Sequence, residues 1–152
     1  MDLRIRSQIS SLDALFLTAE RIEEEELQAH FSKYLCVKTS GLFENYIKSQ
    51  VGDFVQSSSA KPTSNFVKSK IKRFTNIDYK KITEFLTAFS QNWTEQFNDK
   101  LSDDLKSSLN AIISNRNNIA HGHNDSITMR NMREHYENMK RIISILDGII
   151  KK

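Results

Sequence analysis

Glycine and proline are scarce in this chain, and their scarcity limits the folds open to it. Its 152 residues contain only four Gly and one Pro, whereas strands joined by tight turns usually need more of both. The apolar residues recur at spacings of three and four, which is the repeat of a helix face. We therefore predict an all-α protein, folded as a compact helical bundle with a long C-terminal helix.

The same periodicity predicts seven helical segments. Their expected bounds are Gln8–Ile22, Glu25–Val55, Asn65–Phe74, Asp78–Ser90, a short turn at Trp93–Asn98, Asp103–His121 and Ile127–Ile150. Between the second and third lies QSSSAKPTS, residues Gln56–Ser64, whose serine cluster and Pro62 should not continue a helix. We interpret it as a loop within one domain.

Composition predicts a single domain over residues 1–152, with one hydrophobic core. Hydrophobic residues make up 38% of the chain, which suits one core of this size. The net charge of +3 tolerates a polyanionic partner without requiring one. A lone Cys36 excludes an internal disulfide, and no apolar run resembles a signal peptide or a membrane span. We expect a soluble, cytoplasmic protein.

The last predicted helix carries the clearest apolar seam. Its residues repeat with alternating steps of three and four: Met129, Met132, Tyr136, Met139, Ile143, Leu146 and Ile150. We expect this seam to lie in the core. Because methionine is adaptable, the same seam is also compatible with a surface that binds a protein partner.

The helix before it contains an arginine on its apolar face. At about 100° per residue, six apolar residues fall on one arc: Leu105, Leu109, Ile112, Ile113, Ile119 and Ala120. Arg116 lies in the middle of that arc, and its guanidinium cannot lose its charge. Either the position opens onto a groove or a partner, or Arg116 pairs with a buried carboxylate.

His121 ends the same helix and is followed by Gly122, a residue suited to the left-handed backbone just beyond a helix end. A histidine there can simply complement the negative end of the helix dipole. The same position also leaves an imidazole at an exposed corner, where it can accept and donate protons near neutral pH.

Arg116 to His121 reads RNNIAH, which resembles the R-x4-6-H motif of HEPN-domain ribonucleases, including the polar residue after the Arg. The segment Leu105–Ile150 most resembles the RiboL-PSP type of that superfamily, and the rest of the chain resembles it in architecture. The resemblance implies a metal-independent endoribonuclease without a cofactor. It also implies a homodimer in which two motifs face one cleft.

Roles for the motif residues follow from the resemblance. His121 of each chain would form the acid and base pair, Arg116 would hold the phosphate, and Asn117 would hold the phosphate or orient His121. The resemblance also suggests a toxin or defence component, with an antitoxin or other regulatory protein as a partner. His123 stands where related toxins often carry a modified tyrosine. The competing hypothesis is a noncatalytic, HEPN-like interaction module in which Arg116 is a structural ion pair.

A second match to the motif occurs at Arg130 to His135, RNMREH. Arg130 stands one residue off the methionine seam, in the body of the last helix, where charged side chains face solvent. We therefore expect this second match to have no catalytic role.

The sequence HGHND, from His121 to Asp125, also contains H-x-H-x-D, a pattern found in metal sites. A zinc site needs further ligands, and only His30 and His135 remain among the histidines. We expect no metal here, and we expect Asp125 or Ser126 to cap the final helix.

Basic residues cluster in KPTSNFVKSKIKRF: Lys61, Lys68, Lys70, Lys72 and Arg73. Lys68, Lys72 and Arg73, together with His123, are candidate RNA contacts because such clusters follow a phosphate backbone. The alternative is a solvated helix face with Phe66 and Phe74 in the core. The acidic run Glu23–Glu26 would repel RNA, so we expect it to lie away from the cleft.

Overall fold

The computed structural model describes residues 1–151, and within them it contains seven helices and no strand. The helices are α1 (Leu3–Glu20), α2 (Glu25–Ser58), α3 (Lys61–Ile71), α4 (Tyr79–Phe89), α5 (Gln91–Lys100), α6 (Asp103–Ala120) and α7 (Met129–Ile149). The predicted all-α class is confirmed. No helix within the described part of the chain is both long and apolar enough to cross a membrane.

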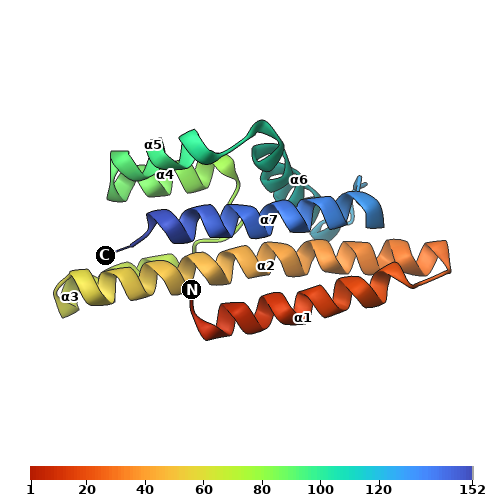
Figure 1. Ribbon diagram of the computed structural model, residues 1–152, viewed down its shortest axis with the longest axis horizontal. Helices are drawn as coiled ribbons and strands as arrows, with labels where there is room; N and C mark the ends of the chain where they lie inside the picture. The colour runs from red at the N-terminus through yellow and green to blue at the C-terminus, as the bar shows by residue number, and fades with distance from the viewer. Residues whose placement is uncertain (152) are drawn as a thin grey trace.

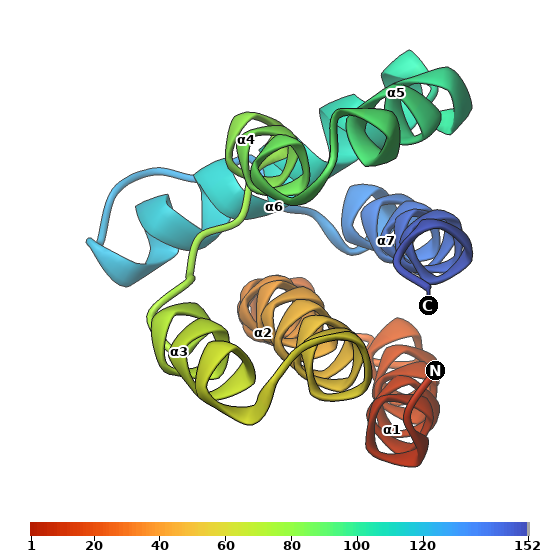
Figure 2. The ribbon, with the colours of Figure 1, turned by 90° about the vertical axis from the view of Figure 1, so that its left-hand side faces the viewer.

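Two long helices, α2 and α7, run side by side through the centre of the molecule (Figure 1). Helix α1 packs along α2 on the side away from the α4–α5 hairpin, and α3 packs against the last turns of α2. Helix α6 crosses α2 and α7 and carries its C-terminal end out to one side (Figure 2). That end and the following loop therefore project from the bundle.

The methionine seam of α7 lies in the core, as predicted. Six of its seven residues are buried, and Met129 is partly buried. Ile142 and Ile149 are buried as well, so the apolar face is wider than the seam. Because these side chains already contact other helices, the seam is not a surface for a protein partner.

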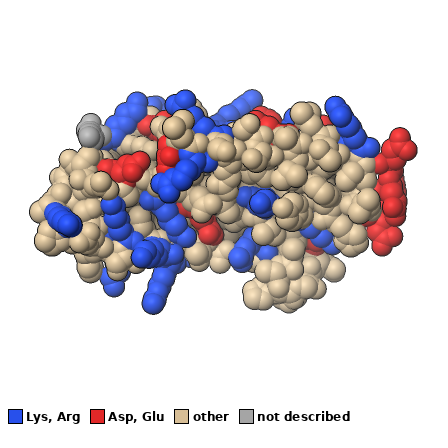
Figure 3. Space-filling view, turned by 90° about the horizontal axis from the view of Figure 1, so that it is seen from below, with Lys and Arg blue, Asp and Glu red and all other residues tan. Residues whose placement is uncertain are grey.

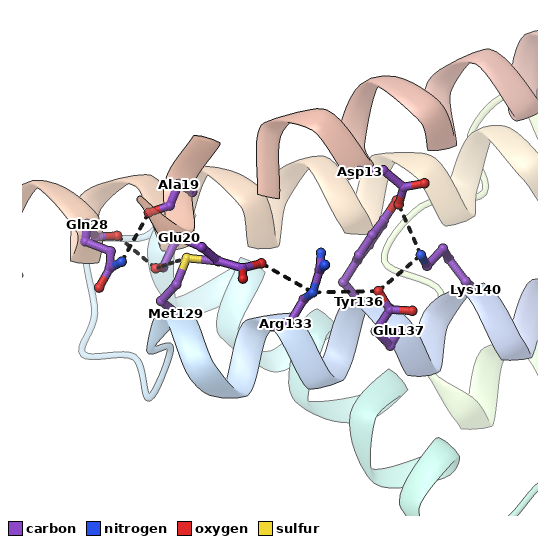
Figure 4. Close-up of polar contacts among 10 residues, drawn as sticks. Asp13, Ala19, Glu20, Gln28, Met129, Arg133, Tyr136, Glu137 and Lys140 are labelled. Carbon is purple, nitrogen blue, oxygen red and sulfur yellow. Dashed lines mark hydrogen bonds and ion pairs between the residues drawn. The ribbon is translucent and has the colours of Figure 1, made fainter. Parts of the chain in front are cut away.

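Tyr136 joins α7 to α1. Its ring stacks on Phe16 with the ring centroids 4.3 Å apart, and its hydroxyl donates to the Asp13 carboxylate at 2.7 Å. Lys140 pairs with the same carboxylate at 3.0 Å, and Arg133 pairs with Glu20 at 3.3 Å (Figure 4). Polar contacts at the rim thus fix the register of two helices whose apolar faces meet beneath.

The predicted loop Gln56–Ser64 was wrong. Helix α2 continues to Ser58, and α3 begins at Lys61 with Pro62 in its first turn. Proline is unfavourable inside a helix but suited to its first turn, where the amide that it lacks would have no helical partner. Only Ser59 and Ala60 separate the two helices.

The first and fifth helices also differ from the prediction. Helix α1 begins at Leu3, five residues earlier than expected, because the Asp2 side chain accepts from the Arg4 amide and caps it. The expected short turn at Trp93–Asn98 is a helix of ten residues, α5, and Trp93 packs against Phe54 and Phe89.

Alanine at Gly41 and at Gly122 should have opposite effects on stability. Gly41 lies inside α2, where an added Cβ meets no atom within 4 Å, so Gly41→Ala should stabilise the protein by up to about 1 kcal/mol. Gly122 has a φ of +68°, so Gly122→Ala should destabilise it by about 1 kcal/mol. Urea denaturation measures both changes, and the same sign for both would contradict this account.

Candidate functional site

Helix α6 ends in the way that the sequence predicts. The amide of Gly122 donates to the Ile119 carbonyl at 3.3 Å, and the amide of His123 donates to the Asn118 carbonyl at 2.8 Å. This double closure needs a left-handed residue, which Gly122 supplies. It turns the chain sharply and leaves both His121 and His123 exposed.

Arg116 is half-buried on α6, one turn before this end. Its guanidinium donates to the Asn117 side-chain oxygen at 3.4 Å, and it forms no ion pair with a carboxylate within residues 1–151. The buried ion pair that the competing hypothesis requires is therefore not formed. Most of the hydrogen-bonding capacity of the guanidinium is left for solvent or a ligand.

The surroundings of Arg116 explain how an apolar arc tolerates it. Cys36 of α2 is fully buried beside it, with its sulfur 3.5 Å from the Ile112 carbonyl. Burial and the nearby Asp125 carboxylate raise the pKa of the Cys36 thiol to about 12, while Arg116 lowers it. Arg116 follows Ile112 by one turn of α6 and is half-buried, so its stem can pack while its charged end reaches solvent.

The two imidazoles of the loop lie near each other. The ring centroids of His121 and His123 are 6.0 Å apart, with 37° between the ring planes. Neither ring forms a hydrogen bond with Arg116 among the described residues. One chain therefore presents a cation and two proton-transfer groups on the same projecting end, and the cation is not hydrogen-bonded to either imidazole.

Asn115 anchors this loop, and sequence reasoning missed it. The Asn115 side chain is buried and donates to the Ala111 carbonyl at 2.9 Å. Its oxygen accepts from the Ser126 amide at 2.9 Å. The sequence pattern could have indicated this role, because Asn115 is a second polar residue beside the apolar arc that contains Arg116.

A second anchor comes from α2. Lys33 pairs with Asp125 at 3.4 Å, and the Asp125 side chain is only 8% exposed. Lys33, Ile119, His123 and Asp125 help to line an open hollow of about 480 Å³ beside the loop. The role of Lys33 had no local signal in the sequence, because it depends on the packing of α2 against the loop.

The H-x-H-x-D residues do not converge on a metal position. Asp125 points inward, where it holds Lys33 and accepts from the Ile127 amide at 3.0 Å, while His121 and His123 face solvent. Residues 1–151 contain no group of three or more side chains placed to hold a metal ion.

The expected cap of the final helix was wrong. Thr128, not Asp125 or Ser126, caps α7: its side chain accepts from the Asn131 amide, and Asn131 accepts from the Thr128 amide in return. This reciprocal pair satisfies two amides at the helix start. Asp125 and Ser126 instead hold the loop.

The second motif match lies in a different setting. Arg130 is exposed on α7, while His135 is half-buried and meets the Ser108 hydroxyl of α6 at 2.9 Å. Asn138 donates to the same hydroxyl at 2.8 Å. Burial lowers the pKa of His135, so a neutral ring helps to join α6 to α7.

The basic candidates lie far from the motif. Lys68 donates to Gln56 near the end of α2, whereas the loop contacts Lys33 near its start. At 1.5 Å per residue, Gln56 and Lys33 are about 35 Å apart along the helix. The structure therefore brings Arg116, Asn117, His121 and His123 together, and it places Lys68, Lys72 and Arg73 on a separate surface at α3.

The phenylalanines of the basic segment differ in burial. Phe74 is partly buried and stacks on Phe85, as expected for a core residue. Phe66 is 62% exposed, with the Lys70 ammonium 5.4 Å from its ring centre. The interpretation that places both rings in the core was wrong for Phe66, which lies on the outer face of α3.

Comparison with known proteins gives a family match for the chain. A family model described as RiboL-PSP-HEPN matches residues 3–152, which is nearly the whole chain. No curated protein and no solved structure gives a significant match.

Replacing Asn115 with Ala should loosen the loop. The variant removes the acceptor of the Ser126 amide, so hydrogen exchange at that amide should rise by up to roughly tenfold, and the protein should lose about 1–2 kcal/mol of stability. Asn118→Ala is the matched control on the same helix, because the Asn118 side chain makes no hydrogen bond within residues 1–151. Equal exchange at Ser126 in both variants would refute the anchor.

Proposed function

The chain belongs to the RiboL-PSP-HEPN family, and from that premise we propose that it is a metal-independent endoribonuclease. The observation that carries the proposal is the unpaired guanidinium of Arg116 at the same helix end as His121. A half-buried cation without a carboxylate partner is a place for an anion to bind. An exposed imidazole five residues further supplies a proton donor or acceptor.

The proposed reaction is attack by the ribose 2′-hydroxyl on the adjacent phosphate. One His121 takes the hydroxyl proton as the oxygen bonds to phosphorus, and the bond to the 5′ oxygen breaks. A second imidazole gives that oxygen a proton. The products are a 2′,3′-cyclic phosphate and a 5′-hydroxyl end. Arg116 stabilises the extra negative charge of the transition state, and Asn117 holds the phosphate or orients His121.

A second chain completes this arrangement in our proposal. A single imidazole cannot serve as base and acid in the same step, and the two rings of one chain lie on the same turn instead of on opposite sides of a substrate. A symmetric dimer through the projecting end of α6 would place His121 of the partner subunit across a shared cleft. Both Arg116 side chains would then face the same phosphate.

The biological setting that we propose is a toxin or defence system in the cytoplasm. An RNA-cleaving toxin needs control, so an antitoxin or other regulatory protein is a further expected partner. His123, in the place of a modified tyrosine, argues against control by modification at that position. His123 is instead available to contact RNA beside His121.

Four variants test the catalytic assignment. Arg116→Ala and His121→Ala should each lower the rate of RNA cleavage by about 10² to 10⁴, the usual loss for a charge-stabilising group or a general acid or base. Arg116→Ala should change stability by less than about 1 kcal/mol, because its one hydrogen bond is long.

The second motif match supplies the controls for this test. Arg130→Ala and His135→Asn should cleave RNA at nearly the parental rate, since Arg130 is exposed and Asn retains a partner for Ser108. Cleavage rates are compared with melting temperatures for all four proteins. If all four folded variants cleave like the parent, the assignment is wrong.

The second prediction from this function concerns assembly. At tens of micromolar, sedimentation should show a dimer. Mixing excess His121→Ala chain into the parent should lower activity more than dilution alone, because mixed dimers lack one of the two imidazoles. A protein that is active and sediments only as a monomer would contradict the shared cleft.

The third prediction concerns metals. Because imidazole and guanidinium replace a metal-bound water in the proposed step, cleavage should persist in EDTA and leave a 2′,3′-cyclic phosphate or its opened product. Mass spectrometry of the cleaved RNA identifies the new ends. Loss of cleavage on chelation with recovery on added zinc would overturn the metal-independent mechanism.

A further inference from the structure

A groove lined by lysines runs along the last part of α2, between α3 and the start of α1. Three adjoining hollows form it: one shares Arg4, Lys48 and Ser49 with the next, which in turn shares Gln56 and Lys68 with the third. Asn45 of α2 and Ser59, just after the end of α2, mark its two ends. These ends are about 21 Å apart along the helix at 1.5 Å per residue.

The charges in this groove are unbalanced. Lys48, Lys68 and Lys72 line the central hollow, where Asp53 is the lining carboxylate. None of these three ammonium groups pairs with a carboxylate within residues 1–151. Arg4 lines it too, but Asp2 already pairs with it at 2.9 Å. The groove therefore keeps an excess of positive charge that the protein itself does not neutralise.

Lysine and arginine side chains gather on this face (Figure 3). They lie over α3 and the nearby parts of α1 and α2, on the left of the view, while acidic side chains gather at the opposite tip. Figure 1 places the connection between α1 and α2, which contains Glu23 and Glu24, at that same tip. The positive charge of the molecule therefore gathers at its α3 end, where it attracts a polyanion.

We infer that this groove is a second RNA-binding surface, which holds the substrate strand away from the scissile phosphate. The inference rests on the proposed ribonuclease function and names a substrate property, a minimum length. The groove lies on the same long helix as the loop anchor, with Gln56 about 35 Å from Lys33 along α2. At roughly 3.4 Å per nucleotide of a stacked strand, that distance corresponds to about ten nucleotides.

Length dependence follows from this geometry. A dodecanucleotide can occupy the Arg116–His121 end and the lysine groove together, so it should bind more tightly and with a steeper salt dependence than a tetranucleotide. A tetranucleotide at the motif spans only about 14 Å and does not reach Lys68. The groove should therefore lower KM for long RNA and leave kcat unchanged.

The test uses the full chain with Lys48, Lys68 and Lys72 all replaced by Gln. Binding is measured by fluorescence anisotropy in the His121→Ala background, which prevents cleavage. The triple variant should bind the dodecanucleotide at least about tenfold more weakly at low salt, and its plot of log K against log salt should be shallower by roughly two units, since each lost contact contributes about 0.7. Binding of the tetranucleotide should not change.

The matched control replaces Lys80, Lys100 and Arg141, which are exposed on α4, α5 and α7, with Gln. It has the same net charge as the test variant and should bind both RNAs like its parent. Equal weakening by the two triple variants would overturn the inference, because net charge alone would then explain the loss. Melting curves for both variants confirm that α3 remains folded.

Cleavage by chains with His121 intact separates this inference from the proposed function. If the groove variant cleaves the dodecanucleotide with parental KM, the groove has no role while the ribonuclease assignment stands. If the parent does not cleave, yet binds the dodecanucleotide through the three lysines, the ribonuclease assignment fails and the RNA-binding surface stands. Raised KM with unchanged kcat supports both.

Discussion

The packing of α2 against α6 and α7 sets the positions of the other helices, of the motif loop and of the lysine groove. Helix α2 spans 34 residues and touches α1, α3, α6 and α7. Its first half meets α6 through Cys36 and the loop after α6 through Lys33, and its second half carries α3 and the lysine groove. Because a helix of this length is stiff, the separation between motif and groove is set by the number of residues between Lys33 and Gln56.

The end of α6 carries one polar residue, Arg116, within its apolar arc and another, Asn115, beside that arc. Asn115 and Arg116 are adjacent in the chain, but they differ in burial and in hydrogen bonding. Asn115 is buried and hydrogen-bonds within the protein, whereas Arg116 is half-buried and has one long hydrogen bond. A buried amide that is satisfied stabilises a loop, while a half-buried cation that is not satisfied is available to a ligand.

Elements with a long, regular apolar repeat could be predicted from the sequence, as α7 and α6 were. The end of α6 was predictable as well, since Gly122 follows the last periodic residue. The start of α3 was not, because Pro62 is compatible with both a loop and a first helical turn. The lysine groove could not be predicted from the sequence, for another reason. Lys48 and Lys68 belong to different helices, and only their packing brings them to one hollow.

The two R-x4-H matches show why position decides what such a motif means. Both have an Asn after the Arg, yet His135 is in mid-helix, where its half-buried ring meets the Ser108 hydroxyl of α6. His121 follows the last turn of its helix, where no further turn can cover it. A ring kept neutral by burial joins two helices, whereas a ring at an open helix end can exchange protons with a substrate. The two matches therefore differ in their position on a helix, and the residue spacing alone does not distinguish them.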